Sequence, residues 1–183
     1  MKHNGSTSDH LAARDAEIFR AFRELYLSIS FDTPREEIYR RVVESPSTRL
    51  WVSECHATDV MSLLLRERRR EVLRRRAALD RPFPDERRES KRQAMINRAI
   101  PGLKESHASI LDNMFPERRA MYEELYRRVC VQFELEPGIT LTEAVFRSIH
   151  QPADRFYLSP ESVPKILLRH RLRQRSQNKQ PAK

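Results

Sequence analysis

Glycine is scarce in this sequence: 183 residues contain only three, Gly5, Gly102 and Gly138. Glycine is the residue that most readily adopts the positive φ angles of phosphate-binding loops, β-bulges and tight hairpin turns. Folds that depend on many such turns are therefore disfavoured. The scarcity of glycine favours a mainly helical protein.

Long apolar segments and cysteine are scarce as well. The longest uninterrupted apolar run is short, Leu63–Leu65, whereas about 20 apolar residues are needed to cross a bilayer. Residues 1–10 are polar and lack the apolar centre of a signal peptide. Two cysteines are too few for a disulfide scaffold and favour a reducing compartment. These features predict no membrane contact, no export and a cytoplasmic location.

Signatures of metal binding and catalysis are missing too. Cys55 and His56 are adjacent and Cys130 stands alone, so the Cys and His spacing supplies no four-ligand zinc site. The glycine-rich, nucleophile-elbow and zinc-protease motifs of common enzyme families do not occur. We expect no metal and no cofactor, and we expect a protein that is not an enzyme. A catalytic function would have to lack a recognisable signature.

Positive charge, by contrast, is abundant. The chain has 35 Lys+Arg against 26 Asp+Glu, a net charge of +9, and only 39% hydrophobic residues. Its length suits one ordinary domain or two small ones. An apolar content below the usual ~45–50% predicts a modest core with long charged extensions, and the net charge indicates a polyanionic partner.

The basic residues are concentrated in two stretches. Arg66–Gln93 contains 12 basic and 6 acidic residues, and Arg169–Lys183 contains 6 basic and no acidic residues. Arginine dominates, which suits bidentate contact with phosphate. An arginine-rich coding bias would explain the same composition, and a charge run is more often a solvated helix face than a binding site. The lack of acids after Arg169 favours binding.

The sequence resembles itself at an offset of 106 residues. Glu37–Met61 aligns with Glu143–Leu167. Chemical character is kept at six substituted pairs: Val43/Ile149, Leu50/Phe156, Trp51/Tyr157, Val52/Leu158, Val60/Ile166 and Met61/Leu167. Five pairs are identical: Glu37/Glu143, Arg41/Arg147, Pro46/Pro152, Arg49/Arg155 and Ser53/Ser159. We interpret this self-similarity as a tandem duplication.

Each copy reads as two helices, a short extended segment and a third helix. The extended segments are Arg49–Val52 and Arg155–Leu158, which are rich in aromatic and branched residues. A threonine followed three residues later by glutamate opens each second helix and predicts a capping box, with Thr33 in the first copy and Thr140 in the second.

These elements predict a mainly α fold made of two similar helical units joined by a basic helical linker. The expected segments are a disordered tail over 1–12, a first repeat unit with its basic helical extension over 13–79, a helical linker over 80–116, a second repeat unit over 117–175, and a disordered basic tail over 176–183.

Two aromatic residues occupy the same place in the two copies. Trp51 follows Arg49, and Tyr157 follows Arg155. In one interpretation the rings stack on bases and the arginines bind phosphates. In the other, the rings pack under the helices and each arginine pairs with a carboxylate of its own copy. We favour packing for the aromatics and keep both interpretations for the arginines.

The order helix, extended segment, helix is typical of two DNA-binding architectures. A helix-turn-helix would need a connector of about 3–4 residues, but the connector Ser45–Ser53 is longer. A ribbon-type reader would pair Arg49–Val52 with Arg155–Leu158, so that one chain imitates a dimer. The default is a set of helical hairpins whose extended pieces only pack over the core.

The segment Pro-Ala-Asp-Arg-Phe-Tyr-Leu-Ser at Pro152–Ser159, followed by a short basic helix, resembles a segment of small uncharacterised basic proteins of bacterial genomes and mobile elements. Their shared pattern is P-x-x-R-F-Y-x-S. The first copy departs from it, with Leu50-Trp51-Val52 in place of Phe-Tyr-Leu. The resemblance implies a bacterial or phage source and no established activity, so no functional residue is carried over.

We therefore predict a non-catalytic nucleic-acid-binding protein with a regulatory or architectural role and double-stranded DNA as the expected partner. Arginines would contact phosphates and give affinity with little base reading. The candidate binding residues are Arg49, Arg68, Arg69, Arg70, Arg74, Arg75, Arg76, Arg155, Arg169, Arg171, Arg173 and Arg175. The alternative is a structural or adaptor protein of a mobile element or phage that docks an acidic protein surface.

Overall fold

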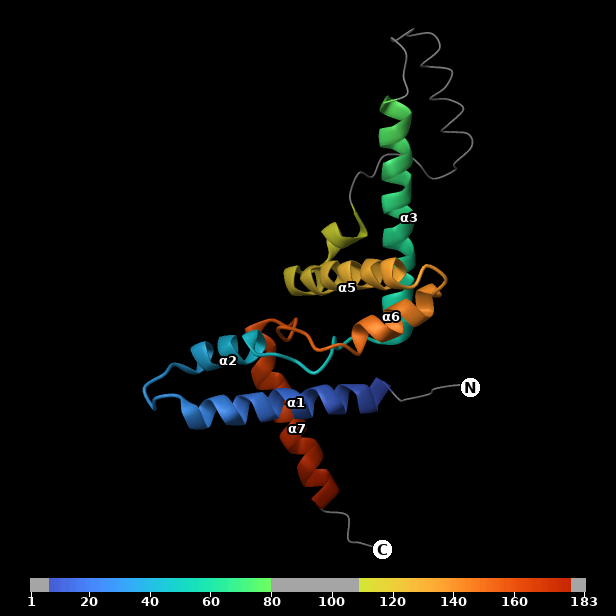
Figure 1. Ribbon diagram of the computed structural model, residues 1–183. Helices are drawn as coiled ribbons and strands as arrows, with labels where there is room; N and C mark the ends of the chain where they lie inside the picture. The colour runs from blue at the N-terminus through green and yellow to red at the C-terminus, as the bar shows by residue number, and fades with distance from the viewer. Residues whose placement is uncertain (1–6, 80–108, 179–183) are drawn as a thin grey trace, which may run out of the picture.

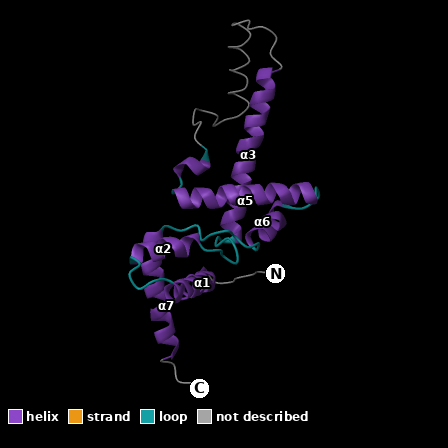
Figure 2. Ribbon diagram, turned by 60° about the vertical axis from the view of Figure 1, so that its left-hand side comes forward, coloured by secondary structure: helices purple, strands orange, loops and turns teal. Residues whose placement is uncertain are grey.

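The computed structural model describes residues 7–79 and 109–178, and these residues are mainly α-helical (Figures 1 and 2). The elements are α1 (Thr7–Ser28), α2 (Arg35–Glu44), α3 (Glu54–Leu79), η1 (Ile110–Asn113), α5 (Pro116–Leu135), α6 (Leu141–Ile149), η2 (Pro160–Ser162) and α7 (Val163–Asn178). No strand occurs within these ranges. The predicted mainly α class is confirmed, whereas most of the predicted linker over 80–116 lies outside the described residues.

Both tails predicted to be disordered are helical where they are described. Helix α1 begins at Thr7 and α7 continues to Asn178, so residues 7–12 and 176–178 belong to helices. At the amino-terminal end, tertiary packing supplies the reason. The His10 ring lies edge-on against Trp51, with 5.2 Å between ring centroids. This contact orders a segment whose composition alone predicts disorder.

Of the two predicted capping boxes, only the threonine half of the second forms among the described residues. The Thr140 side chain accepts a hydrogen bond from the Glu143 amide at 3.2 Å and caps α6. At α2 the cap residue is Pro34, with no side-chain hydrogen bond. The prediction of a Thr33 cap is wrong because Thr33 belongs to the preceding turn, where its amide donates to the Ser30 carbonyl.

The helices form two halves, each with its own buried core. In the first, α1 packs against α2 and α7; in the second, α5 and α6 pack together and against α3 (Figure 1). We call these the α1 half and the α5 half. The core of the α1 half contains Ile18, Ile38, Val42, Val43, Phe156, Val163, Ile166 and Leu167. The core of the α5 half includes Leu50, Val60, Met61, Leu64, Met121, Tyr122, Leu125, Val129, Val145 and Ile149.

Each half takes its third helix from the other end of the chain. Helix α3 follows α2 in sequence but packs against α5 and α6, and α7 follows α6 but packs against α1 and α2. The two connecting segments that carry the chain between the halves therefore run in opposite directions, and they lie side by side at an antiparallel contact that we call the crossing. As a result, the first predicted repeat unit, 13–79, is spread over both halves.

The crossing is held by backbone hydrogen bonds. Ser47 and Ala153 form an isolated antiparallel bridge, in which each amide donates to the other carbonyl at 2.8 Å. On one side the Leu50 amide donates to the Ile149 carbonyl, and on the other the Phe156 amide donates to the Val43 carbonyl, both at 2.9 Å. The two donors, Leu50 and Phe156, are 106 residues apart, and so are the two acceptors, Val43 and Ile149. Ser47 and Ala153 are separated by the same offset, at which the sequence resembles itself.

The crossing segments also decide between the DNA-binding architectures considered above. The connector from Glu44 to Glu54 is too long and extended for a helix-turn-helix. Within the described ranges the two segments pair only at the Ser47–Ala153 bridge, so no two-stranded ribbon forms over Arg49–Val52 and Arg155–Leu158. Instead, the extended pieces pack over the cores.

Candidate nucleic-acid interface

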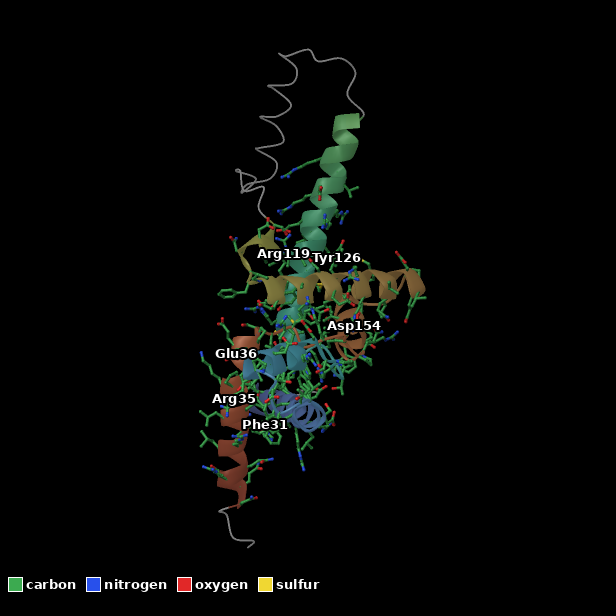
Figure 3. The ribbon with its side chains drawn as sticks, turned by 90° about the vertical axis from the view of Figure 1, so that its left-hand side faces the viewer. Phe31, Arg35, Glu36, Arg119, Tyr126 and Asp154 are labelled. Carbon is green, nitrogen blue, oxygen red and sulfur yellow. The ribbon has the colours of Figure 1, made fainter. Side chains whose placement is uncertain are left out.

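The carboxyl-terminal part of α3 extends beyond the α5 half (Figures 1 and 3). Leu64 is the last buried residue among the side chains of α3 that the structure describes, and Arg66, Arg69, Arg70 and Arg74 after it are all exposed. Residues spaced three and four apart share a helix face, so these four arginines form one basic surface. We call it the α3 ridge. None of the four has an ion-pair partner in the described part of the chain.

Two neighbouring residues on α3 make contacts within the protein, although the Arg68 side chain is still exposed. Glu67 accepts hydrogen bonds from the Ser109 hydroxyl and the Ile110 amide, both at 3.0 Å, and so holds η1 against α3. Arg68 lies over the ring of Tyr126 at 6.0 Å and pairs with Glu71 at 3.3 Å. The labelled Tyr126 lies on α5 beside α3 (Figure 3). Arg68 is thus partly engaged within the protein.

The predicted residues Arg75 and Arg76 lie in the last turns of α3. Their side chains fall outside the part of the chain that the structure describes. The exposed face of the α3 ridge is therefore defined by Arg66, Arg69, Arg70 and Arg74 alone.

The four predicted arginines of α7 fall into two pairs. Arg171 and Arg175 are exposed and have no ion-pair partner among the described residues. Arg169 and Arg173 turn toward α1, where both bind the carboxylate of Asp15. Arg169 binds it with two bonds of 2.6 Å, and Arg173 with one of 2.9 Å. Along this basic run, the arginines that face solvent therefore alternate with those that face the protein.

Burial and pairing shift the pKa values of this cluster. Burial of the Asp15 carboxyl would raise its pKa, but hydrogen bonding and attraction by Arg169, with Arg14 and Arg173, outweigh burial and lower it. The hydrogen bond to Asp15 raises the pKa of Arg169. Asp15 is therefore an ionised carboxylate with no exposed surface, held by arginines from a helix at the other end of the chain.

Arg49 and Arg155 take up equivalent positions at the crossing. The guanidinium of Arg49 lies 5.4 Å from the ring centroid of Trp51, and that of Arg155 lies 4.9 Å from the ring centroid of Tyr157. Burial lowers the pKa of Arg49. All four residues line one small hollow. Each arginine is thus stacked on the aromatic residue of its own segment, a partner that neither interpretation of the sequence named.

The aromatic rings themselves pack as expected. Trp51 lies against the core of the α1 half, and its indole N–H contacts a Glu17 oxygen at 2.9 Å and the Ser47 hydroxyl at 3.0 Å. Tyr157 packs against the core of the α5 half. The half-buried rings offer little surface for stacking on bases.

Sequence reasoning missed Asp15, Arg14 and Arg66. The local pattern around Asp15 gives no signal, because its partners Arg169 and Arg173 are more than 150 residues away. The only hint is that α1 carries an acid near its apolar face, three residues before Ile18. Arg66 belongs to the basic stretch already identified, and its exposure on α3 adds it to the interface.

Neither a metal centre nor a membrane-spanning helix is found among the described residues. No group of three or more His, Cys, Asp or Glu side chains in these ranges is placed to hold a metal ion. No helix there is both long and apolar enough to cross a membrane. Cys55 and Cys130 are both free thiols.

Comparison with known proteins identifies no relative of this chain. No protein-family model, no curated protein and no solved structure matches the chain. The resemblance of Pro152–Ser159 to basic proteins of bacterial mobile elements therefore stays a prediction, and the function has to be argued from the residues themselves.

Proposed function

We propose that this protein is a non-catalytic nucleic-acid-binding protein that grips phosphates with the α3 ridge. The observation that carries the proposal is the exposure of Arg66, Arg69, Arg70 and Arg74 on one helix face without an acidic partner among the described residues. An exposed guanidinium loses little hydration on binding and contacts phosphate through two parallel hydrogen bonds. Double-stranded DNA is the expected partner.

The second contact would come from α7. Arg171 and Arg175 are exposed there, whereas Arg169 and Arg173 are engaged by Asp15. Helices α3 and α7 run toward opposite ends of the molecule (Figures 1 and 2). Two basic ends that face apart favour an architectural role, in which the chain holds two segments of duplex at once.

The two halves are, in this proposal, copies of one ancestral unit. The hydrogen bonds at the crossing and the stacked pairs Arg49/Trp51 and Arg155/Tyr157 all support a duplication, because they recur at an offset of 106 residues. A duplication of this kind would give one chain two basic third helices, related as in a dimer. The bacterial or mobile-element source remains part of the proposal.

The test is fluorescence anisotropy with a labelled random duplex and a labelled single strand, over roughly 50 to 300 mM salt, where phosphate contacts lose most affinity. The triple variant Arg69→Gln, Arg70→Gln, Arg74→Gln should bind duplex more weakly. Its slope of log affinity against log salt should be shallower by about 2–3, since each phosphate contact contributes ~0.9.

The matched control is Arg20→Gln, Arg23→Gln, Arg35→Gln, which removes the same charge from exposed positions of α1 and α2 (Arg35 is labelled in Figure 3). It should keep most of the slope. Equal losses in both triple variants would show a response to net charge alone, and no binding of the wild type at 50 mM salt would refute the proposal.

One observation favours the alternative, a protein that docks a partner protein. Three large apolar side chains are exposed near the turn between α1 and α2: Tyr26 at 55%, Leu27 at 75% and Phe31 at 99% (Phe31 is labelled in Figure 3). An exposed apolar cluster is typical of an interaction surface. If this alternative holds, Leu27→Ser with Phe31→Ser should abolish capture of a partner while nucleic-acid anisotropy stays at its background value.

A further inference from the structure

Three arginines surround one buried carboxylate where α1 crosses α7. Asp15 has no exposed surface. Its Oδ1 contacts Arg169 at 2.6 Å and Arg14 at 3.4 Å, and its Oδ2 contacts Arg169 at 2.6 Å and Arg173 at 2.9 Å. Three guanidinium groups thus share the single negative charge of one carboxylate.

The charges of this cluster do not balance. Among the described residues, Asp15 is the acidic group that acts on Arg14 and on Arg169, and Arg14 is further repelled by Arg169 and Arg173. Three positive charges and one negative charge leave an excess of two. Such an excess is unfavourable in a partly desolvated site unless an anion compensates it.

Arg14 is the least satisfied member of the cluster. Its Nε is buried and has no hydrogen-bond acceptor among the described residues. Burial lowers the pKa of Arg14 despite the neighbouring Asp15. A buried guanidinium N–H normally has an acceptor, and among the described residues this one has none.

The cluster is nevertheless open to a ligand. The side chains of Arg14, Arg169 and Arg173 are 17%, 41% and 31% exposed. Asp15 uses only part of the donor capacity of each guanidinium, which carries five N–H groups. All three guanidiniums contact the same carboxylate and keep further N–H groups, so their remaining donors lie close together.

We propose that Arg14, Arg169 and Arg173 form a binding site for a phosphate monoester dianion, with Asp15 holding the arginines in position. A phosphate monoester carries about −1.5 to −2 charges at pH 7 and three acceptor oxygens, which match the excess charge and the three guanidiniums. A phosphodiester carries one charge and would leave the site positive. The site is distinct from the α3 ridge, so this proposal does not depend on nucleic-acid binding by the ridge.

The phosphate group has three possible sources: free inorganic phosphate, a nucleotide, or the terminal phosphate of a nucleic-acid strand. All three present the same tetrahedral oxyanion to the arginines. The site would therefore recognise the phosphate group itself, and the experiment distinguishes the three sources.

The first experiment measures thermal stability of the full chain at pH 7.5 in inorganic phosphate and in sodium chloride at equal ionic strength. A ligand that binds only the folded state raises Tm in a saturable way, so phosphate should raise Tm of the wild type above the value in chloride. Arg14→Gln should weaken phosphate binding by about 10- to 100-fold, the effect of one charge-assisted hydrogen bond.

Arg20→Gln is the matched control, since Arg20 is an exposed arginine of the same helix. It should keep the full phosphate-dependent rise in Tm. If the role of Arg14 were purely structural, Arg14→Gln would lower Tm by the same amount in phosphate and in chloride. That outcome, or equal Tm values of the wild type in the two salts, would overturn the proposal.

The second experiment identifies the source by titration calorimetry. The ligands are inorganic phosphate, adenosine monophosphate, and one short oligonucleotide with and without a 5′-phosphate. The ligand with the highest affinity that is lost in Arg14→Gln names the source. The triple variant of the α3 ridge should keep this affinity, so that failure of the nucleic-acid proposal and failure of the phosphate site are distinguishable.

Discussion

Ser47 and Ala153 exchange both of their backbone hydrogen bonds, each at 2.8 Å, at the point where the two connecting segments cross. Both residues are buried, at 3% and 2% exposure. Because of this crossing, α3 completes the α5 half and α7 completes the α1 half. Neither the amino-terminal helices α1–α3 nor the carboxyl-terminal helices α5–α7 form a complete core by themselves.

The first prediction concerns the interlocked halves. A protease site inserted between residues 80 and 108 of the full chain should allow cleavage without separation. The two fragments should co-elute in native size-exclusion chromatography, because α3 and α7 each pack against helices of the other fragment. They should separate in denaturant. Separate elution of two folded fragments under native conditions would contradict the exchange of helices.

The second prediction concerns Phe156, which follows the crossing in the second segment but is buried in the α1 half at 3% exposure. Phe156→Ala should lower the free energy of unfolding by about 3–5 kcal/mol, the usual cost of deleting a core phenylalanine. Phe115→Ala is the control, since Phe115 is 81% exposed, and should change stability by less than ~0.5 kcal/mol. Urea denaturation measures both, and similar losses would refute this placement of Phe156.

The third prediction concerns Asp15. Asp15→Asn leaves Arg169 and Arg173 without their carboxylate and should destabilise the protein by about 2–3 kcal/mol. The loss should be smaller than for a sealed ion pair because both arginines remain partly exposed to water. Chemical denaturation at pH 7 measures the change. An unchanged midpoint would show that the carboxylate contributes nothing to the packing of α1 on α7.

The fourth prediction concerns the pH dependence of stability. The pKa of Asp15 is lowered in the folded protein, since Arg169 and its neighbours outweigh the opposing effect of burial. A carboxyl with a depressed folded pKa contributes stability that is complete above its unfolded pKa, about 3.9, and is lost as pH falls through the folded value.

The measurement is urea denaturation from pH 6 down to the lowest pH at which the protein still folds. The difference in stability between the wild type and Asp15→Asn should be constant above about pH 5 and should shrink as the pH falls below about 4. Use of the difference removes the contributions of the other carboxyl groups. A difference that stays constant over the whole range would contradict the depressed pKa.

The local part of the fold was predictable because it depends on neighbouring residues. The 3–4 spacing of apolar residues indicated the helices, and the aromatic residues of the extended segments pack as expected. The Thr140 side chain caps α6 as predicted, but the Glu143 carboxylate pairs with Arg147. The Thr33 cap did not form, because a turn upstream engages Thr33. Predictions failed where a distant contact, such as that of His10 with Trp51, outweighs local composition.

The candidate site was predictable only in part. Composition identified the basic stretches, and Arg69, Arg70 and Arg74 lie on the continued third helix as predicted. Their exposure on one face was not decided by the sequence. The same composition gave no means of separating Arg171 from Arg169, although one is exposed and the other binds Asp15. That division depends on which face of α7 meets α1, and a charge count contains no information about it.

By itself the sequence determined the helices, their apolar faces, the net charge and the self-similarity at 106 residues, because each of these follows from short-range spacing or composition. The tertiary structure alone decided which half each third helix completes. The apolar faces of α3 and α7, built on Val60 and Met61 in one and Ile166 and Leu167 in the other, are alike in pattern. Their partners are therefore chosen by the crossing at Ser47 and Ala153, and that choice brings Asp15 to Arg169.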